Sequence, residues 1–117
     1  MEGQLVHFEL PAQDSGRAKT FWSSLFGWKF HEWSGPVEYH MLDGNEPGGA
    51  IYPAQDGKQG PVIYFGTGDI EKSVARVREL GGEAEDKLPV QGYGWFAGCR
   101  DTEGNAFSLW QSDESAA

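Results

Sequence analysis

The first patterned segment of the chain alternates between apolar and polar side chains. In residues 5–12 (LVHFELPA) the apolar side chains share one face and the polar ones share the other, Val6, Phe8 and Leu10 against His7 and Glu9. A period of two residues predicts a β-strand that buries its apolar face.

A helix is expected directly after this strand. Asp14 stands where an N-cap residue belongs, before GRAKTFWSSLF, and Gly27 stands where a left-handed residue ends a helix. Between them, apolar residues recur at helical spacing, at Ala18, Phe21, Trp22, Leu25 and Phe26. This spacing predicts a stripe of core residues packed on a sheet.

The same signals return in the second half of the chain. The apolar run VIYF (62–65) is followed by Asp69 in the place of Asp14 and by Gly82 in the place of Gly27. The buried stripe of this second helix is expected at Ile70, Val74, Val77 and Leu80, with Leu80 in the place of Leu25. After each helix, runs broken by Gly and Pro predict three more strands: WKFHEW, VEYHML and GGAIYP, then GEAED, GWFAGCR and NAFSLWQ.

Each half therefore reads strand, helix, strand, strand, strand. We expect two modules, at about residues 4–55 and 60–112, to form one domain over residues 1–117, because repeats of this kind bury their faces against each other. The linker AQDGKQGP between them is polar and rich in turn residues. A ferredoxin-like or other α+β sandwich with coincidental similarity between its halves is the alternative.

Composition narrows the classes of function. The formal net charge of −9 argues against nucleic acid and against an anionic membrane surface as partners. The lone Cys99 cannot form an internal disulfide, and we expect neither a signal peptide nor a transmembrane span, so a cytoplasmic location is predicted. Five Trp, seven Phe and four Tyr point to a core, or a cavity, lined by rings.

The chain resembles the vicinal oxygen chelate superfamily, which includes glyoxalase I, bleomycin-resistance proteins and extradiol dioxygenases. Three stretches carry the resemblance: VHFELPAQDSGRAKTFWSSLFGWKF, GDIEKSVARVRELGGEAE and GWFAGCRDTEGNAFSLWQ. The last is similar to the family's Asp-Pro-x-Gly-Asn turn and final strand, with Thr102 in the place of the proline. The resemblance, which points to small glyoxalase-like proteins of unassigned activity, implies an α+β fold. Two tandem βαβββ modules would form one cup-shaped, barrel-like mixed sheet with helices outside, in a homodimer.

Metal-dependent members of this superfamily place four ligands on the face of the cup, from the first and last strands of each module. Carried over by position, these places fall at His7, Val62, Ala50 (or Gly49) and Ser108, where metal-binding relatives carry Glu. Only His7 is a metal ligand, and a catalytic site needs about three protein ligands. The resemblance therefore implies no metal and no other cofactor here, and metal-dependent lyase or dioxygenase chemistry is not expected.

Alternation points further side chains toward the predicted cup. His7 and Glu9 would serve as polar anchors for a ligand or as an acid–base pair, and Tyr52, Tyr64 and Trp110 would surround a planar, apolar or cationic ligand. With Ala50, Val62 and Ser108 these are the expected ligand-binding positions, while no catalytic residue is assigned. The alternative is that the rings fill the cup and leave no cavity.

Three functions follow from these features. The first is metal-independent binding of a small aromatic or cationic molecule. The second is a glyoxalase-type lyase or isomerase acting on a hemithioacetal or related α-keto compound. It would use either metal-free acid–base chemistry or a relocated metal at His7, Glu9 and His40. The third is an interaction module that dimerises through its sheet edges.

Overall fold

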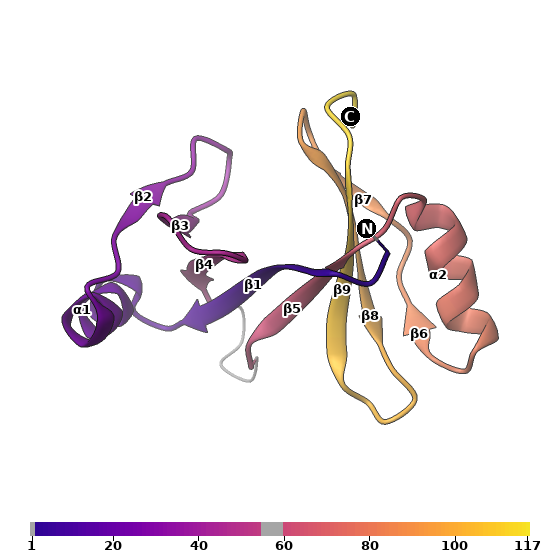
Figure 1. Ribbon diagram of the computed structural model, residues 1–117, viewed down its shortest axis with the longest axis horizontal. Helices are drawn as coiled ribbons and strands as arrows, with labels where there is room; N and C mark the ends of the chain where they lie inside the picture. The colour runs from indigo at the N-terminus through magenta and orange to yellow at the C-terminus, as the bar shows by residue number, and fades with distance from the viewer. Residues whose placement is uncertain (1, 55–59) are drawn as a thin grey trace. The chain divides into compact units, whose positions relative to one another are not determined.

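The computed structural model describes residues 2–54 and 60–117 (Figure 1). The chain forms two compact units: one is His7–Val62, and the other is Ile63–Ala117 joined by the N-terminal residues before His7. The predicted linker at residues 54–61 lies mostly outside the described residues, since 55–59 are not among them.

The first unit contains one helix and four strands. The elements are β1 (Leu5–Ala12), α1 (Ser15–Phe26), β2 (Phe30–Glu32), β3 (His40–Leu42) and β4 (Gly48–Pro53). Strand β4 pairs in parallel with β1 and antiparallel with β3, which pairs antiparallel with β2. The five predicted elements of the first module are confirmed in type and order.

The second unit repeats this arrangement with one difference. Its elements are β5 (Val62–Gly66), α2 (Ile70–Glu79), β6 (Glu83–Ala84), β7 (Leu88–Val90), β8 (Gly94–Arg100) and β9 (Ala106–Ser112). Strand β9 pairs in parallel with β5 and antiparallel with β8, and both β6 and β7 pair antiparallel with β8. The strand predicted at GEAED is the short β6, and β7 is an additional strand that the sequence did not predict.

The predicted α+β class with two βαβββ modules is confirmed. In each unit the first and last strands are parallel and the other pairs are antiparallel. Parallel strands need a long crossover connection, which here includes the helix. Both predicted N-caps form: an Asp14 side-chain oxygen accepts the Arg17 amide at 3.0 Å, and an Asp69 oxygen accepts the Lys72 amide at 3.1 Å. Gly27 ends α1 in the left-handed region at φ 73°.

The core of the second unit lies between α2 and the sheet. Its buried members are Ile70 and Val74 from the helix and Ala97, Cys99 and Leu109 from β8 and β9. The register places Ala97 opposite Leu109 and Cys99 opposite Phe107, so these side chains share the face that α2 covers. Cys99 is therefore a packing residue, and burial, helped by the charge of Glu85, raises its pKa to about 11.

Two details of the second helix were predicted wrongly. Leu80 is 60% exposed, because α2 ends at Glu79 and Leu80 is its C-cap rather than part of the buried stripe. The left-handed residue after the helix is Gly81, at φ 94°. Gly82 serves another purpose, since a Cβ there would lie 2.7 Å from the Arg100 carbonyl oxygen. It allows the backbone to pass close to β8.

The apolar stripe of α1 is not buried, which corrects the prediction that it forms the core. Phe21, Leu25 and Phe26 are 57%, 55% and 61% exposed, and α1 has no buried residue. Its rings contact other rings, as in the stack of Trp22 on Trp28 at 5.0 Å. Small folded units leave a larger share of their surface exposed than large domains do.

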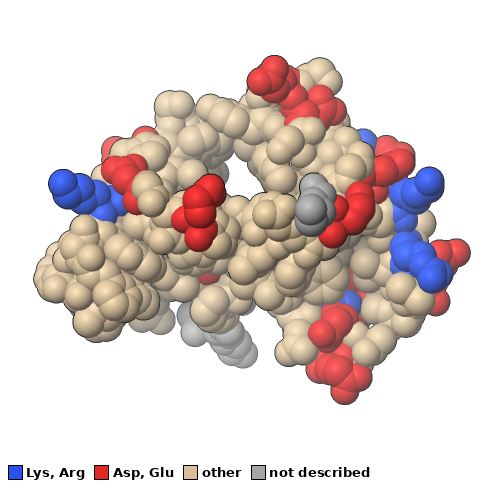
Figure 2. Space-filling view, in the orientation of Figure 1, with Lys and Arg blue, Asp and Glu red and all other residues tan. Residues whose placement is uncertain are grey.

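Acidic side chains are more numerous than basic ones, which gives the formal net charge of −9. Figure 2 shows acidic side chains scattered over the visible face, while the basic side chains over α2 are interspersed with acidic ones. Among the described residues, no helix has the length and apolar character needed to span a membrane.

Candidate functional site

The face of the first unit's sheet that points away from α1 carries the candidate site. The register places His7 opposite Gly48 and Glu9 opposite Ala50 on β1 and β4. Alternation brings these residues to one face and sends Phe8 to the other, where its ring contacts Trp28. Tyr39 enters the same face as His7, because it precedes β3 and alternates with Met41, which pairs with Ala50.

Tyr39 connects the two polar side chains of β1. Its hydroxyl donates to Glu9 Oε2 at 2.6 Å and lies 2.7 Å from His7 Nε2. The imidazole and phenol rings are nearly parallel, with centroids 6.1 Å apart. His7, Tyr39 and Glu9 thus form one hydrogen-bonded chain across the face.

This chain fixes where the proton of neutral His7 lies. The single hydroxyl proton of Tyr39 goes to Glu9, because a carboxylate only accepts. His7 Nε2 must therefore donate to the phenol oxygen, which leaves the lone pair of the neutral imidazole on Nδ1. Across the sheet, Nδ1 faces Gly48, where a Cβ would lie 3.7 Å away.

Burial controls ionisation at this face. It lowers the pKa of His7, because an imidazolium would lose hydration there, so His7 is neutral at pH 7. Burial and the negative charge of Glu9 raise the pKa of Tyr52, so its phenol also stays neutral. This face therefore combines the neutral imidazole of His7, the neutral phenol of Tyr52 and the carboxylate of Glu9.

Two further aromatic rings contact that of Tyr39. The Tyr52 ring lies 6.3 Å from that of Tyr39, and the Trp33 ring meets Tyr39 edge-on at 5.9 Å. The Trp33 amide donates to the Tyr39 carbonyl at 2.9 Å and closes the connection between β2 and β3. Gly35 lets the indole lie on the backbone, since a Cβ there would lie 2.0 Å from the ring.

We call this group the Tyr39 cluster: His7, Glu9, Trp33, Tyr39 and Tyr52. Its rings offer faces to an apolar or cationic group, its carboxylate offers a charge, and its imidazole offers a proton acceptor. His7 and Glu9 are its two potential metal ligands, fewer than the three that a catalytic metal takes.

The sequence-predicted positions fall into two groups. His7, Glu9 and Tyr52 lie in the Tyr39 cluster, and Ala50 is buried beside them, opposite Glu9. The rest belong to β5 and β9: Tyr64 pairs with Ser108, Trp110 pairs with Gly66, and Val62 begins β5. Tyr64, Ser108 and Trp110 share the face opposite α2, and Ser108 is buried.

His40 does not join His7 and Glu9, so the relocated metal site suggested for these three is not formed. The register places His40 opposite Ile51, on the face toward α1. There its ring nitrogens lie 2.8 Å from a Glu38 carboxylate oxygen and 3.4 Å from Lys19 Nζ. Over residues 2–54 and 60–117, no three His, Cys, Asp or Glu side chains are grouped to hold a metal ion.

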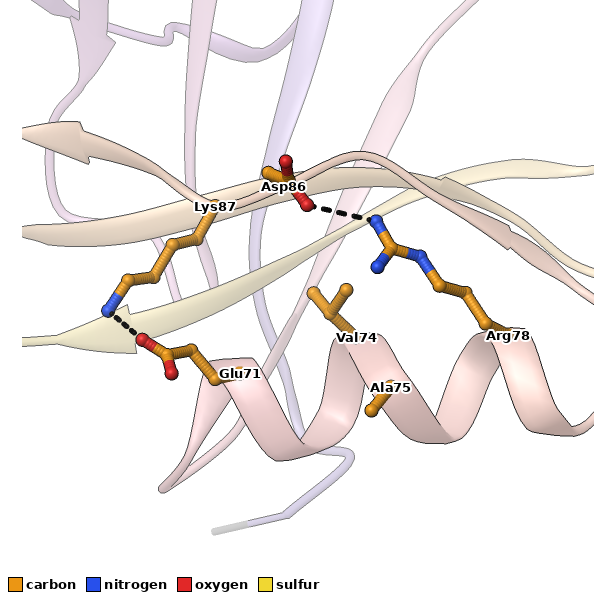
Figure 3. Close-up of a pocket in the computed structure, with 6 residues that line it drawn as sticks. All are labelled: Glu71, Val74, Ala75, Arg78, Asp86 and Lys87. Carbon is orange, nitrogen blue, oxygen red and sulfur yellow. Dashed lines mark hydrogen bonds and ion pairs between the residues drawn. The ribbon is translucent and has the colours of Figure 1, made fainter.

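A hollow of about 310 Å³ lies in the other unit, between α2 and residues 86–87 (Figure 3). Ion pairs cross it at both ends, Lys87–Glu71 at 2.8 Å and Arg78–Asp86 at 3.1 Å. Figure 3 shows Val74 between these pairs. Each charged side chain here is paired with one of opposite sign. We therefore interpret these ion pairs as contacts that hold residues 85–87 against α2.

Sequence reasoning missed Tyr39 and Trp33. Tyr39 lies in the predicted strand VEYHML, and alternation with Met41 indicates its face, but only the β3–β4 register brings it to Glu9. Trp33 lies in a connection between strands, and its ring is placed by Gly35, a contact with no periodic signal.

Residues 4–109 match the family model of the Glyoxalase/Bleomycin resistance protein/Dioxygenase superfamily. The chain belongs to this superfamily. A glyoxylase-like domain-containing protein from Didymella fabae is 28% identical over 120 residues, which cover 93% of this chain and 94% of the relative.

Solved structures share the fold at low sequence identity. A hypothetical protein, BH1468, from Bacillus halodurans C-125 has a TM-score of 0.77 at 16% identity, covering 100% of this chain and 99% of that one. A methylmalonyl-CoA epimerase from Streptomyces coelicolor, solved with 2-nitronate-propionyl-CoA, has a TM-score of 0.71 at 17% identity, with the same coverage. A superfamily member from Vibrio splendidus 12B01 has a TM-score of 0.71 at 16% identity, covering 94% and 99%.

Proposed function

We propose that this superfamily member binds a small aromatic or cationic molecule at the Tyr39 cluster, without a metal. The observation that carries the proposal is the His7–Tyr39–Glu9 chain, with its 2.7 Å and 2.6 Å contacts, set among the rings of Trp33 and Tyr52. Binding sites combine rings with a few well-placed polar groups in this way. Ala50, opposite Glu9, belongs to this proposed site, and Val62, Tyr64, Ser108 and Trp110 remain separately proposed ligand contacts.

The experiment is a fragment screen on protein stripped of metal with a chelator. Ligand-observed NMR with aromatic and cationic fragments would find binders, and Tyr52→Leu would test where they bind. We expect binders that the substitution weakens. Binding that appears only after Ni, Zn, Fe or Mn is restored, and that His7→Ala abolishes, would contradict the proposal.

The second candidate is a glyoxalase-type lyase or isomerase that moves a proton without a metal. One observation favours it: His7 is neutral, its Nε2–H is held by Tyr39, and its lone pair lies on Nδ1. A base so oriented suits removal of a proton beside a carbonyl group. Turnover of the hemithioacetal of methylglyoxal and glutathione, lost in His7→Gln, would support it. No turnover with or without added metal would count against it.

We further propose that the protein is a homodimer, as its superfamily resemblance implies. The exposed rings of α1 are consistent with a covered surface, since large apolar patches on a monomer mark interaction sites. Light scattering at micromolar concentration would give the mass of two chains. A mass of one chain would refute the proposed homodimer.

A further inference from the structure

The hollow beside α2 has on its wall a basic side chain that the protein holds in a fixed orientation. Its volume of about 310 Å³ is at the lower end of the range typical of small-ligand sites. Arg78 donates from Nε and Nη2 to the Ala84 carbonyl oxygen, at 3.1 and 2.8 Å. These two bonds fix the plane of the guanidinium group, so a ligand that binds it would cost little further side-chain entropy.

The acidic partner of Arg78 is held much less firmly. Asp86 accepts one bond from Arg78 Nη2 at 3.1 Å, and its side chain is 94% exposed, against 49% for that of Arg78. Within the described part of the chain, this is the only hydrogen bond that the Asp86 carboxylate makes. Because so exposed an ion pair contributes little to stability, Asp86 is a replaceable counter-ion.

Arg78 also has donors to spare. A guanidinium group has five N–H donors, and two of its nitrogens can hold both oxygens of one carboxylate. Nε and Nη2 make the bonds described above, while Nη1 donates to no protein acceptor over residues 2–54 and 60–117. In Figure 3, Nη1 lies on the Val74 side of the guanidinium group. An incoming carboxylate can therefore bond Nη1 and take the place of Asp86 on Nη2.

The rest of the hollow suits an apolar group. Val74 and Ala75 line it, and Val74 is buried. At the other end, Lys87 Nζ lies 2.8 Å from a Glu71 carboxylate oxygen and 4.0 Å from the centroid of the Trp95 ring, so this end carries no unpaired charge. Helix α2 has three basic and two acidic side chains, so the acidic excess of the chain is not concentrated here.

We infer that the hollow beside α2 binds small monocarboxylates that carry an apolar group. The carboxylate would replace Asp86 on Arg78, and the apolar group would cover Val74. The bonds of Arg78 to Ala84 and of Lys87 to Glu71 would still hold residues 85–87 against α2. All of these residues belong to the second unit, so the inference goes beyond the function proposed for the Tyr39 cluster and does not depend on it.

The test is an NMR titration of the ¹⁵N-labelled full-length protein at low salt with three probes. These are benzoate, its uncharged analogue benzamide, and acetate, which lacks the apolar group. We expect benzoate to give saturable shift changes at residues 71–78 and 84–87. It should bind about tenfold more tightly than benzamide or acetate, because only benzoate combines a charge-assisted pair with apolar burial.

Two substitutions at the ion pair test how the carboxylate is held. Arg78→Lys keeps the charge but loses the fork, and it should weaken benzoate about fivefold. Arg76→Lys, on α2 but outside the hollow, is the matched control and should have no effect. Asp86→Asn removes the internal competitor and should strengthen benzoate about threefold. Glu79→Gln removes the same charge from the partner of Arg76 and should give a smaller gain.

Equal affinities for benzoate and benzamide would overturn the inference, and so would equal losses in Arg78→Lys and Arg76→Lys. Equal gains in Asp86→Asn and Glu79→Gln would also overturn it, because the attraction would then come from net charge alone. If Arg78→Lys fails to fold by circular dichroism, the gain in Asp86→Asn still decides. Shift changes confined to the Tyr39 cluster would support the proposed function and overturn this inference. Absence of saturable shifts with benzoate at tens of millimolar would overturn it as well.

Discussion

Replacing Tyr39 by Phe tests whether the His7–Tyr39–Glu9 chain is real. The substitution removes one oxygen and keeps the ring contacts with His7, Trp33 and Tyr52. It deletes a hydrogen bond to a carboxylate at 2.6 Å and one to an imidazole at 2.7 Å.

The size of the effect follows from these two bonds. A hydrogen bond to a charged group contributes about 1.5–3 kcal/mol and a neutral one about 0.5–1.5 kcal/mol, before water replaces the lost partner. Because the cluster is half-buried and water can reach it in part, we expect the free energy of unfolding to fall by about 1–2 kcal/mol. Urea denaturation at pH 7 would measure it.

Two further readouts make the reasoning refutable. In the wild type, ¹⁵N chemical shifts of His7 should show a protonated Nε2 and an unprotonated Nδ1, and Tyr39→Phe should mix the two tautomers. A double-mutant cycle of Tyr39→Phe with Glu9→Gln should be non-additive by at least about 0.5 kcal/mol. Ordinary surface substitutions change the free energy of unfolding by less than about 0.5 kcal/mol. A loss this small in Tyr39→Phe, with the His7 tautomer unchanged, would refute the hydrogen-bonded chain.

Three other predictions follow from single residues. Folding lowers the pKa of His7, so the unfolded chain binds a proton more readily than the folded one. The free energy of unfolding should therefore fall as the pH drops from about 6.5 through the lowered pKa. Urea unfolding at several pH values would measure this pH dependence, and the same dependence in His7→Gln would contradict its assignment to His7. Gly49→Ala should cost about 1–3 kcal/mol, because its Cβ would lie 2.3 Å from the Phe8 ring; Gly48→Ala, whose Cβ would lie 3.7 Å from His7, is the matched control, and equal losses in urea would contradict the close packing. Cys99, buried and with a pKa of about 11, should react slowly with iodoacetamide at pH 7.5 until urea unfolds the protein; rapid labelling of the native protein would show that the thiol is accessible.

The local chemistry of the sequence predicted most of the fold. Asp14 and Asp69 were readable as N-caps because the bond each makes is to an amide three residues along the chain. The face shared by His7 and Glu9 was readable from a period of two. Such signals involve neighbours in the chain, so they need no knowledge of how the strands pair.

Features that depend on distant partners could not be read in this way. Helical spacing predicts the apolar stripe of α1, but not that Phe21 and Phe26 on this stripe stay exposed. Gly82 looked like a helix end and is required by the approach of β8 instead. Tyr39 reaches Glu9, and His40 is turned away from it, through the register of β3 with β4. Residues so far apart in sequence had no visible relation.

The most direct test of metal-free binding at the Tyr39 cluster is an NMR titration of metal-stripped, ¹⁵N-labelled protein with phenyltrimethylammonium. Our account predicts saturable shift changes at His7, Glu9, Trp33, Tyr39 and Tyr52 that are unaltered when Ni or Zn is added. Shift changes that appear only with added metal, or that leave these five residues unaffected, would contradict it.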